Sequence, residues 1–292
     1  MEELFGLLAV AKPKGITSTG VLNEIKRHFG VRRIGHTGTL DPFAEGLLLL
    51  LLGRATRLAE YYQRLPKTYR AVGLLGVETD TYDITGEVIS RREAAAFPPL
   101  EEIERVVKSF EGEIEQTPPP FSAKKVGGKR AYKLARKGKR VELKPVKVKV
   151  YKIDLLEYNP PRFTIGATVS GGTYIRSLVK DIGDKLGLGA TTEKLLRTSI
   201  GKLTLENALP LEELLKVSPE RLSDFLLPPD AGLDFPTLEV SDRELTRLRN
   251  GQLIDLKGDF GENQLLRVYA GGKFSAIGRV VGGKLKPEKV FV

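Results

Sequence analysis

The sequence contains no cysteine and only two histidines, His28 and His36, among its 292 residues. The lack of thiols excludes disulfides, thiolate nucleophiles and cysteine-based zinc sites, and two histidines argue against a histidine-rich metal centre. No apolar run approaches the ~20 residues that a membrane-spanning helix needs. Glu2 and Glu3 open the chain where a signal peptide would be basic. We therefore expect a cytoplasmic protein with no membrane segment and no bound metal.

The charge of the chain is positive and unevenly distributed. The formal net charge is +10 and the isoelectric point is about 9.6. The stretch from Lys124 to Lys149 contains twelve Lys or Arg residues and one acid, Glu142, so it carries a net charge of +11 and the rest of the chain is close to neutral. Such segregation favours a polyanionic partner, most simply nucleic acid, over a generally basic surface that binds nothing.

Residues 124–140 are called the basic segment below. Gly127 and Gly128 interrupt it, and only a short helix, over residues 131–136, fits inside it. Its few apolar residues cannot pack alone, so we expect an insertion that projects from the body and becomes ordered on binding RNA. The residues of this segment expected to contact RNA are Lys124, Lys125, Lys129 and Arg130.

A glycine-rich loop with one aspartate precedes the most apolar part of the sequence. Residues 33–46 read Arg-Ile-Gly-His-Thr-Gly-Thr-Leu-Asp-Pro-Phe-Ala-Glu-Gly, and six leucines, residues 47–52, follow. The leucines predict a buried strand, and the glycines allow a tight turn close to a ligand. Pro42 restricts the chain beside Asp41. The pattern fits a carboxylate held rigidly at the end of a buried sheet, and it also fits an ordinary turn in which Asp41 bonds its own backbone.

Alternation and helical periodicity predict an α+β protein. Ser18 and Thr173 are expected to cap two helices, and the buried face of a third is expected to begin at Leu100. Gly30 and Gly112 are expected to end helices. The expected strands cover residues 5–11, 47–52, 68–75, 87–90, 146–157 and 163–169, and the expected helices cover residues 18–29, 57–64, 100–110, 174–186 and 242–249.

Arg176 falls in the first turn of the helix predicted after Thr173, where the helix dipole disfavours a cation. This position suggests an anionic partner for the guanidinium, although it is also compatible with an ordinary surface arginine. His28 falls in the last turn of the first predicted helix, which suits its charge, and is expected on the surface.

The sequence changes character after residues 226–230, Leu-Leu-Pro-Pro-Asp. From Gly232 onward, short strands, a helix capped by Ser241 and glycine-pair turns at residues 271–272 and 282–283 predict a compact β-rich module of about 60 residues. We therefore predict two domains, residues 1–231 and 232–292, with the smaller packed on the larger.

Several motifs together resemble the tRNA pseudouridine-55 synthases of the TruB family, over nearly the whole chain. The glycine-rich motif that contains Asp41 and the motif that contains Arg176 are highly specific. The C-terminal module is similar to a PUA RNA-binding domain. Phe121 departs from the tyrosine that is frequent at its position in the family. The resemblance implies the pseudouridine synthase fold: a mixed, mainly antiparallel sheet flanked by helices, plus a small β-rich PUA-like domain. The motifs are Gly35-His36-Thr37-Gly38-Thr39-Leu40-Asp41-Pro42, Lys67-Thr68-Tyr69, Thr81-Tyr82-Asp83, Thr85-Gly86, Pro119-Pro120-Phe121-Ser122-Ala123 and Gly172-Thr173-Tyr174-Ile175-Arg176-Ser177-Leu178.

The activity implied by the resemblance is that of a tRNA pseudouridine(55) synthase, an isomerase. It would flip a uridine out of the T-arm loop of tRNA, cut the base from the ribose and rejoin it through C5. No cofactor and no metal are implied, because nothing is oxidised and no group is imported. Asp41 would be the catalytic carboxylate, attacking the sugar C1′ or the base or deprotonating the sugar, and Arg176 would pair with it. The PUA-like module would hold the acceptor end of the tRNA, and we expect a monomer.

Further site residues are implied by the same resemblance. Tyr69 would stack on the target uracil and its phenol could help to remove the C5 proton, whereas without the resemblance it would be a core strand residue. His36 would enter the space left by the flipped base, although a lone histidine is more often structural. The remaining residues expected near the RNA are Lys67, Tyr174, Leu196 and Arg197.

Two other functions fit parts of the sequence. A non-catalytic RNA chaperone or scaffold would use the same positive charge, but it has no use for a lone carboxylate, which repels phosphate. A phosphate-loop enzyme would use the glycine-rich segment, but the pattern G-x-x-x-x-G-K-[ST] does not occur and residues 35–41 contain no lysine. We therefore favour the synthase.

Overall fold

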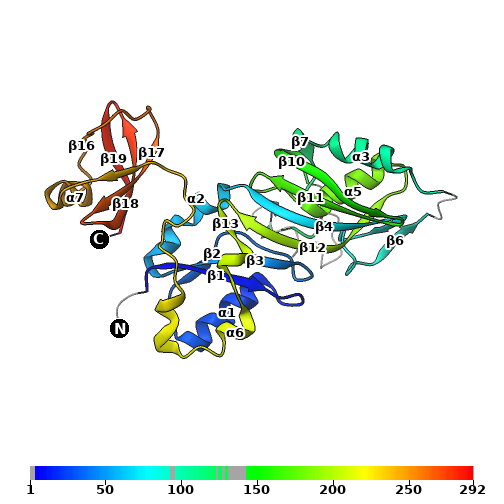
Figure 1. Ribbon diagram of the computed structural model, residues 1–292, viewed down its shortest axis with the longest axis horizontal. Helices are drawn as coiled ribbons and strands as arrows, with labels where there is room; N and C mark the ends of the chain where they lie inside the picture. The colour runs from blue at the N-terminus through cyan, green and yellow to red at the C-terminus, as the bar shows by residue number, and fades with distance from the viewer. Residues whose placement is uncertain (1–3, 93–95, 123, 127–128, 131–142, 292) are drawn as a thin grey trace.

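The computed structural model of the protein describes residues 4–92, 96–122, 124–126, 129–130 and 143–291 (Figure 1). Most of these residues form a body built on a ten-stranded sheet, and the C-terminal residues form a five-stranded sheet. The helix predicted over residues 131–136 lies outside the described residues. Within the described part of the chain, no helix is long and apolar enough to cross a membrane.

The sheet of the body is mixed and mainly antiparallel, as predicted. Its strands are β1 (Gly6–Lys12), β2 (Ile34–His36), β3 (Glu45–Leu52), β4 (Lys67–Leu75), β7 (Gly112–Gln116), β10 (Val146–Asn159), β11 (Arg162–Val169), β12 (Ala190–Ile200), β13 (Leu203–Thr204) and β14 (Leu209–Pro210). They lie in the order β14-β1-β3-β12-β4-β11-β10-β7, with β2 paired to β3 and β13 to β12. The pairs β1–β14 and β3–β12 are parallel.

Helices pack against two parts of this sheet. They are α1 (Ser18–Phe29), η1 (Gly53–Leu58), α2 (Ala59–Arg64), α3 (Leu100–Lys108), α5 (Ile175–Lys185), η2 (Leu205–Asn207), α6 (Leu211–Leu214) and η3 (Pro219–Phe225), where η marks a 3-10 helix. One apolar cluster joins α3 and α5 to β4, β10 and β11, and another joins α1, α6 and η3 to β1 and β3. A small hairpin, β5 (Val77–Thr79) with β6 (Val88–Arg91), lies outside the large sheet.

The six leucines of β3, residues 47–52, are all fully buried. The odd-numbered leucines pack in a cluster with Tyr61 and Tyr62 of α2, and the even-numbered leucines pack with Val21 and Ile25 of α1. Successive side chains of a strand point to opposite faces. The unbroken leucine run is therefore a strand that is buried on both sides.

Two helix caps differ from the sequence prediction. Thr17, not Ser18, caps α1: its hydroxyl accepts a hydrogen bond from the amide of Gly20 at 2.8 Å. Ser18 is the first helical residue, so its buried hydroxyl is free to hold the loop described in the next section. Tyr174, not Thr173, directly precedes α5, and its own side chain makes no capping hydrogen bond.

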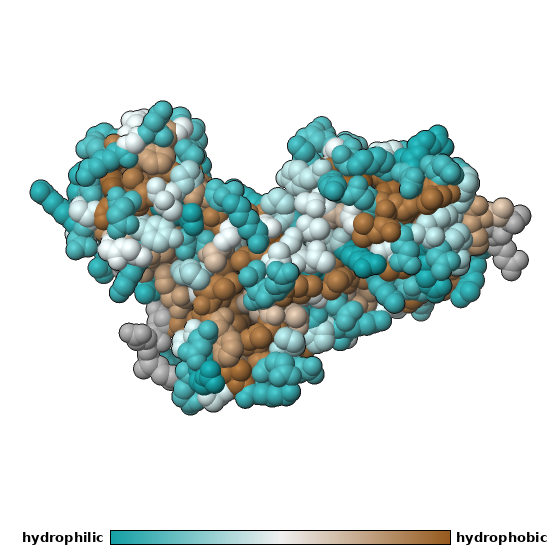
Figure 2. All heavy atoms as spheres, viewed as in Figure 1, coloured by the Kyte–Doolittle hydropathy of each residue, from teal (hydrophilic) through white to brown (hydrophobic). Residues whose placement is uncertain are grey.

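Leu100 does not belong to the buried face of α3. It is the first residue of the helix and is 47% exposed, whereas the buried residues Ile103, Val106 and Val107 begin one turn later. Figure 2 shows apolar surface over the end of the body that carries α3 and β10. Leu156 of β10 is a second exposed leucine in this part of the protein.

The C-terminal sheet stands at one end of the molecule, beyond α2 (Figure 1). Its elements are β15 (Thr237–Glu239), α7 (Asp242–Arg249), β16 (Ile254–Asp255), β17 (Leu265–Ala270), β18 (Lys273–Val281) and β19 (Lys284–Val290), in the strand order β15-β17-β18-β19-β16. Ser241 caps α7 as predicted, in a capping box with Glu244. The glycine pairs at 271–272 and 282–283 have positive φ and form the two hairpin turns. The sheet has an apolar core of its own.

The C-terminal sheet is attached to the body by apolar and polar contacts. Phe5 lies against Phe274 and Phe291, with ring centroids 6.4 and 5.3 Å apart. Tyr61 of α2 donates a hydrogen bond to Glu288 at 2.9 Å. The body and the C-terminal sheet thus share part of one apolar cluster.

Candidate active site

Asp41 opens a tight turn that leads into β3. The amide of Ala44 donates to the carbonyl of Asp41 at 3.1 Å, and Pro42 occupies the second position of the turn, where its fixed φ is favoured. Ala44 is fully buried, whereas the side chain of Asp41 is 31% exposed. The turn is therefore anchored in the core while its carboxylate stays accessible.

Two buried polar side chains hold the backbone on either side of Asp41. Ser18 Oγ accepts from the amide of Leu40 at 2.8 Å and donates to the carbonyl of Leu40 at 3.0 Å. Lys12, at the end of β1, donates to the carbonyl of Pro42 at 3.4 Å. Burial lowers the pKa of Lys12 to about 8, and the nearby Asp41 carboxylate opposes this shift. Elements remote in sequence thus fix the turn that carries Asp41.

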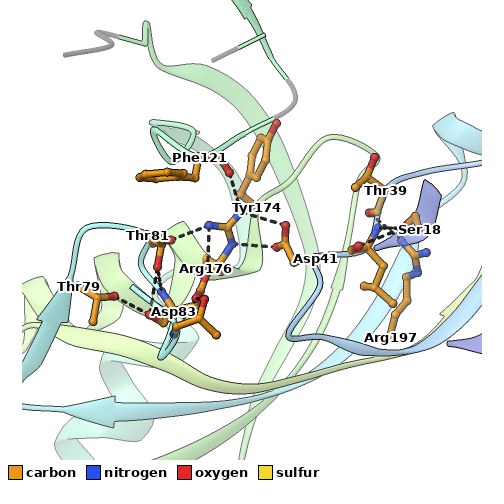
Figure 3. Close-up of polar contacts among 12 residues, drawn as sticks. Ser18, Thr39, Asp41, Thr79, Thr81, Asp83, Phe121, Tyr174, Arg176 and Arg197 are labelled. Atoms are coloured by element: carbon orange, nitrogen blue, oxygen red, sulfur yellow. Dashed lines mark hydrogen bonds and ion pairs between the residues drawn. The ribbon is translucent and has the colours of Figure 1, made fainter. Parts of the chain in front are cut away.

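Arg197 of β12 also binds the loop that carries Asp41 (Figure 3). Its Nε donates to the carbonyl of Leu47 at 2.7 Å, and Nη1 and Nη2 donate to the carbonyls of Thr39 and Gly38 at 3.4 and 3.3 Å. The contact is tight, because at Gly46 φ is +111° and a Cβ would collide with the backbone of Arg197. Glycine is thus required where β3 passes β12.

Arg176 is the centre of the site (Figure 3). Its Nε and Nη2 donate to the two carboxylate oxygens of Asp41 at 2.8 and 3.1 Å. Its Nη1 donates to the carbonyl of Thr81 at 2.6 Å and lies 3.3 Å from a carboxylate oxygen of Asp83. Its Nη2 also donates to the carbonyl of Phe121 at 3.0 Å. Four of the five N–H groups of the guanidinium therefore donate hydrogen bonds, and Nη1 also forms the ion pair with Asp83.

Two carboxylates surround this one guanidinium, and they differ in exposure. The side chains of Arg176 and Asp83 are 4% and 6% exposed, against 31% for Asp41. The predicted anionic partner of Arg176 is thus found, and Asp83 adds a second one. The bidentate geometry fixes the plane of the Asp41 carboxylate. Asp41 is the member of the group that a substrate can reach.

The first turn of α5 also holds the segment that follows β7. The side-chain amide of Gln116 bonds the amide and the carbonyl of Tyr174 at 2.7 and 3.0 Å. Ser177 Oγ donates to the carbonyl of Thr117 at 2.8 Å. Phe121 contributes its carbonyl to the site, so its difference from tyrosine leaves the bond to Arg176 intact. Tyr174 is half-buried, and burial raises the pKa of its phenol.

Tyr69 lies on the face of β4 that meets α5. It is 8% exposed and shares an apolar cluster with Leu195 of β12. Leu195 pairs with Ala71 across the two strands, and Leu196 pairs with exposed Arg70. Because side chains alternate along a strand, Leu196 lies on the opposite face of the sheet. This register corrects the expectation for Leu196 and places Leu195 beside Tyr69.

Lys67 and Arg197, both expected to contact RNA, are buried and bind backbone carbonyls instead. Lys67 is 6% exposed, and its Nζ donates to the carbonyls of Gln63 and Leu65 at 2.9 and 2.7 Å, at the end of α2. Burial lowers the pKa of Lys67 to about 8. In this arrangement neither side chain presents its charge at the surface, where RNA phosphates would lie.

The remaining residues named from the sequence are His36 and the four residues of the basic segment. His36 ends β2, opposite Leu50 of β3, and is half-buried. Lys124 is also half-buried, and the next residues form a short hairpin of β8 (Lys125–Val126) with β9 (Lys129–Arg130). Much of the basic segment lies outside the described residues.

Three side chains that hold the site together, those of Asp83, Ser18 and Lys12, were not predicted from the sequence to belong to it. Asp83 was part of a recognised motif, and its acidity was the available signal. Ser18 was expected to cap a helix, and Lys12 gave no signal beyond its place at the end of a predicted strand. Each acts on a residue distant in sequence, which spacing alone does not show.

Comparison with solved structures identifies the class of protein that this fold and site define. A structure described as a Cbf5-Nop10-Gar1 complex matches 99% of this chain and 85% of the other, with a TM-score of 0.76 and 26% identity. A structure of an H/ACA RNP bound to a substrate RNA containing 2'-deoxyuridine matches the same shares, with a TM-score of 0.75 and 25% identity. The body has the pseudouridine synthase fold.

The sequence narrows this class to one family. The N-terminal domain of TruB family pseudouridylate synthase matches residues 26–175, and two TruB C-terminal domains match residues 176–234 and 236–291. The chain belongs to the TruB family of pseudouridine synthases. It is 43% identical to the tRNA pseudouridine synthase B of Aquifex aeolicus, over 98% of this chain and 99% of the relative. The protein of the same name from Thermosipho melanesiensis is 46% identical over 85% of this chain and 80% of its own length.

Proposed function

We propose that this protein converts the uridine at position 55, in the T-arm loop of tRNA, to pseudouridine. The observation that carries the proposal is the Asp41–Arg176 pair, in which a buried guanidinium orients one accessible carboxylate. The names of the relatives supply the substrate class, tRNA. The net charge of +10 supports a nucleic-acid substrate.

The reaction breaks the bond from uracil N1 to ribose C1′ and forms a bond from C5 to C1′. N1 gains a proton and C5 loses one, so the change is balanced without a co-reactant. Asp41 attacks C1′ or the base, or removes a proton from the sugar. Arg176 holds the carboxylate in one orientation, and such positioning supplies part of the rate acceleration.

Tyr69 and His36 are proposed to act on the flipped base and on the space that it leaves. Flipping a base out of a folded loop costs a few kcal/mol. Tyr69 lies at the edge of the cluster that contains Leu40, next to Asp41 in sequence, and its ring is proposed to stack on the uracil. His36, on the loop that carries Asp41, is proposed to occupy the vacated position.

The two parts of the chain are proposed to bind different parts of the tRNA. Residues 1–231 would form the catalytic domain and residues 232–292 a PUA-like domain that holds the acceptor end. The basic segment would contact phosphates through Lys124, Lys125, Lys129 and Arg130. We further propose that the protein acts as a monomer in the cytoplasm.

The proposal is tested by mapping pseudouridine in an unmodified tRNA transcript after incubation with the purified protein. One pseudouridine is expected, at position 55, and none in a transcript that carries cytidine there. Tight binding without any modification would instead identify a non-catalytic RNA scaffold. Modification of a different uridine would refute the proposed position.

A further inference from the structure

Two buried threonine hydroxyls lie beneath the loop that holds Arg176. Thr79 Oγ1 donates to the carbonyl of Asp83 at 2.8 Å, and it lies 2.9 Å from Thr191 Oγ1 of β12. Because Thr79 has only one hydroxyl proton, which goes to Asp83, Thr191 is the donor in the second bond. The two threonines are 1% and 0% exposed, so water does not replace either bond.

The loop over these hydroxyls, residues 80–86, is fixed closely to β12. The amide of Ile84 donates to the carbonyl of Thr192 at 2.9 Å, and the amide of Thr192 donates to the carbonyl of Tyr82 at 3.0 Å. Tyr82 has a φ of 62°, a conformation rare for residues with a side chain. Such a conformation persists only where the surroundings impose it. The hydroxyl pair and these backbone bonds supply part of that constraint, together with bonds inside the loop such as that from the amide of Tyr82 to the carbonyl of Thr79 at 3.2 Å.

Both groups that bind Arg176 Nη1 belong to this loop. They are the carbonyl of Thr81 and the carboxylate of Asp83, on either side of Tyr82. The same strand that carries Thr191 carries Arg197 six positions later, and Arg197 binds the loop of Asp41. Strand β12 thus contacts both the loop that carries Asp41 and the loop that binds Arg176.

We propose that Thr79 and Thr191 are positioning residues for catalysis, which set the place of Asp83 and, through it, the orientation of Arg176 and Asp41. The proposal rests on the proposed function, because it assigns these hydroxyls to the chemical step of that reaction. Neither threonine is bonded to Arg176 or Asp41 directly, so both act through the loop.

The test is the single-turnover rate of pseudouridine formation in a T-arm stem-loop at saturating protein. Thr79→Val keeps the shape of the side chain and removes the hydroxyl. We expect the rate to fall about 10- to 100-fold, since displacement of a catalytic group by 1 Å costs about 10²-fold. RNA affinity should change less than about two-fold, because no phosphate contact is altered. Thr79→Ser, which restores the hydroxyl, should recover most of the rate.

A matched control is available in the same sheet. Thr168 Oγ1 lies 3.0 Å from Thr68 Oγ1 in a cross-strand pair on β11 and β4, away from the Asp83 loop. Thr168→Val removes the same kind of bond and should leave the rate unchanged. Thr68 and Thr168 are half-buried, so this pair is less shielded from water than Thr79 and Thr191. If threonine pairs only stabilise the fold, both valine variants should lower the melting temperature, each by its own amount, and neither should slow the chemical step.

A double-mutant cycle with Asp83→Asn separates positioning from general stability. Because Thr79 is proposed to act through Asp83, adding Thr79→Val to Asp83→Asn should slow the reaction little further. Multiplication of the two losses, failure of Thr79→Ser to recover the rate, or equal effects of the two valine variants would overturn the proposal. Should Thr79→Val not fold, Thr191→Val and Thr191→Ser provide the same comparison. A wild-type protein that modifies no uridine would instead refute the proposed function.

Discussion

Replacement of Arg197 by lysine keeps the positive charge but removes the planar fork that binds three carbonyls of the Asp41 loop. Arg197 is 1% exposed. Because lysine carries a single ammonium group, we expect a lysine at this buried position to reach one of the three carbonyls. Two charge-assisted hydrogen bonds are then lost, each worth about 1–1.5 kcal/mol at these distances. The free energy of unfolding should fall by about 2–3 kcal/mol, and the melting temperature by about 4–12 °C.

The same change should slow the reaction, because Thr39, which Arg197 binds, lies two residues before Asp41. We expect Arg197→Lys to lower the single-turnover rate about 10-fold or more, with little change in affinity for a T-arm stem-loop. Arg70→Lys, an exposed arginine on the neighbouring strand, is the matched control and should change neither quantity. An unchanged melting temperature together with weaker RNA binding would refute the anchoring role and support a direct contact with RNA.

Three further predictions follow from the buried charges and from Tyr69. Asp83→Asn removes one of the two anions around Arg176, so kcat should fall at least about 10-fold while RNA affinity is retained; wild-type turnover would show that Asp83 is dispensable. Tyr69→Phe keeps the ring, so binding should persist; normal turnover would exclude the phenol from proton transfer, and lost turnover would support it. The pKa of Lys67 is lowered from 10.5 to about 8, so between these values the unfolded chain holds a proton that the folded chain has released. This residue therefore makes the free energy of unfolding increase with pH in that window, by at most about 3 kcal/mol. Denaturant unfolding at pH 7.5 and 9.5 should show a smaller increase in the free energy of unfolding for Lys67→Met than for the wild type. An identical pH dependence of both proteins would contradict the lowered pKa of Lys67.

Local sequence patterns predicted much of the fold. The structure confirms the strand predicted from the leucine run. It also confirms the helix that ends at Gly30 and the helix capped by Ser241, which were predicted from apolar periodicity and from these terminal residues. Strand β7 (Gly112–Gln116) was missed because Ile114 is its one large apolar residue and stands between two glutamates; charged side chains are common on an edge strand. Strand β12 was missed because two register shifts interrupt its alternation.

The site was predictable only in part. Asp41, Tyr69 and Arg176 were named from motifs, and the structure brings Asp41 and Arg176 into direct contact. Lys67 and Arg197 point inward because the fold places backbone carbonyls within reach of their side chains. The spacing of residues in the sequence does not show where those carbonyls lie. Leu196 was expected near the RNA, but it lies on the face of the sheet opposite Leu195 and Tyr69, because in a strand a shift of one residue reverses the direction of the side chain.

Asp41 is proposed to carry out the chemistry, while the rest of the site positions its carboxylate. The most direct measurement compares wild type with Asp41→Asn on one T-arm stem-loop, with RNA affinity and single-turnover pseudouridine formation measured on the same samples. The amide keeps the shape of the side chain, so affinity should stay within about three-fold, and pseudouridine formation should be lost because an amide is neither a nucleophile nor a base of comparable strength. Formation of pseudouridine by Asp41→Asn at a rate near that of wild type would contradict the account.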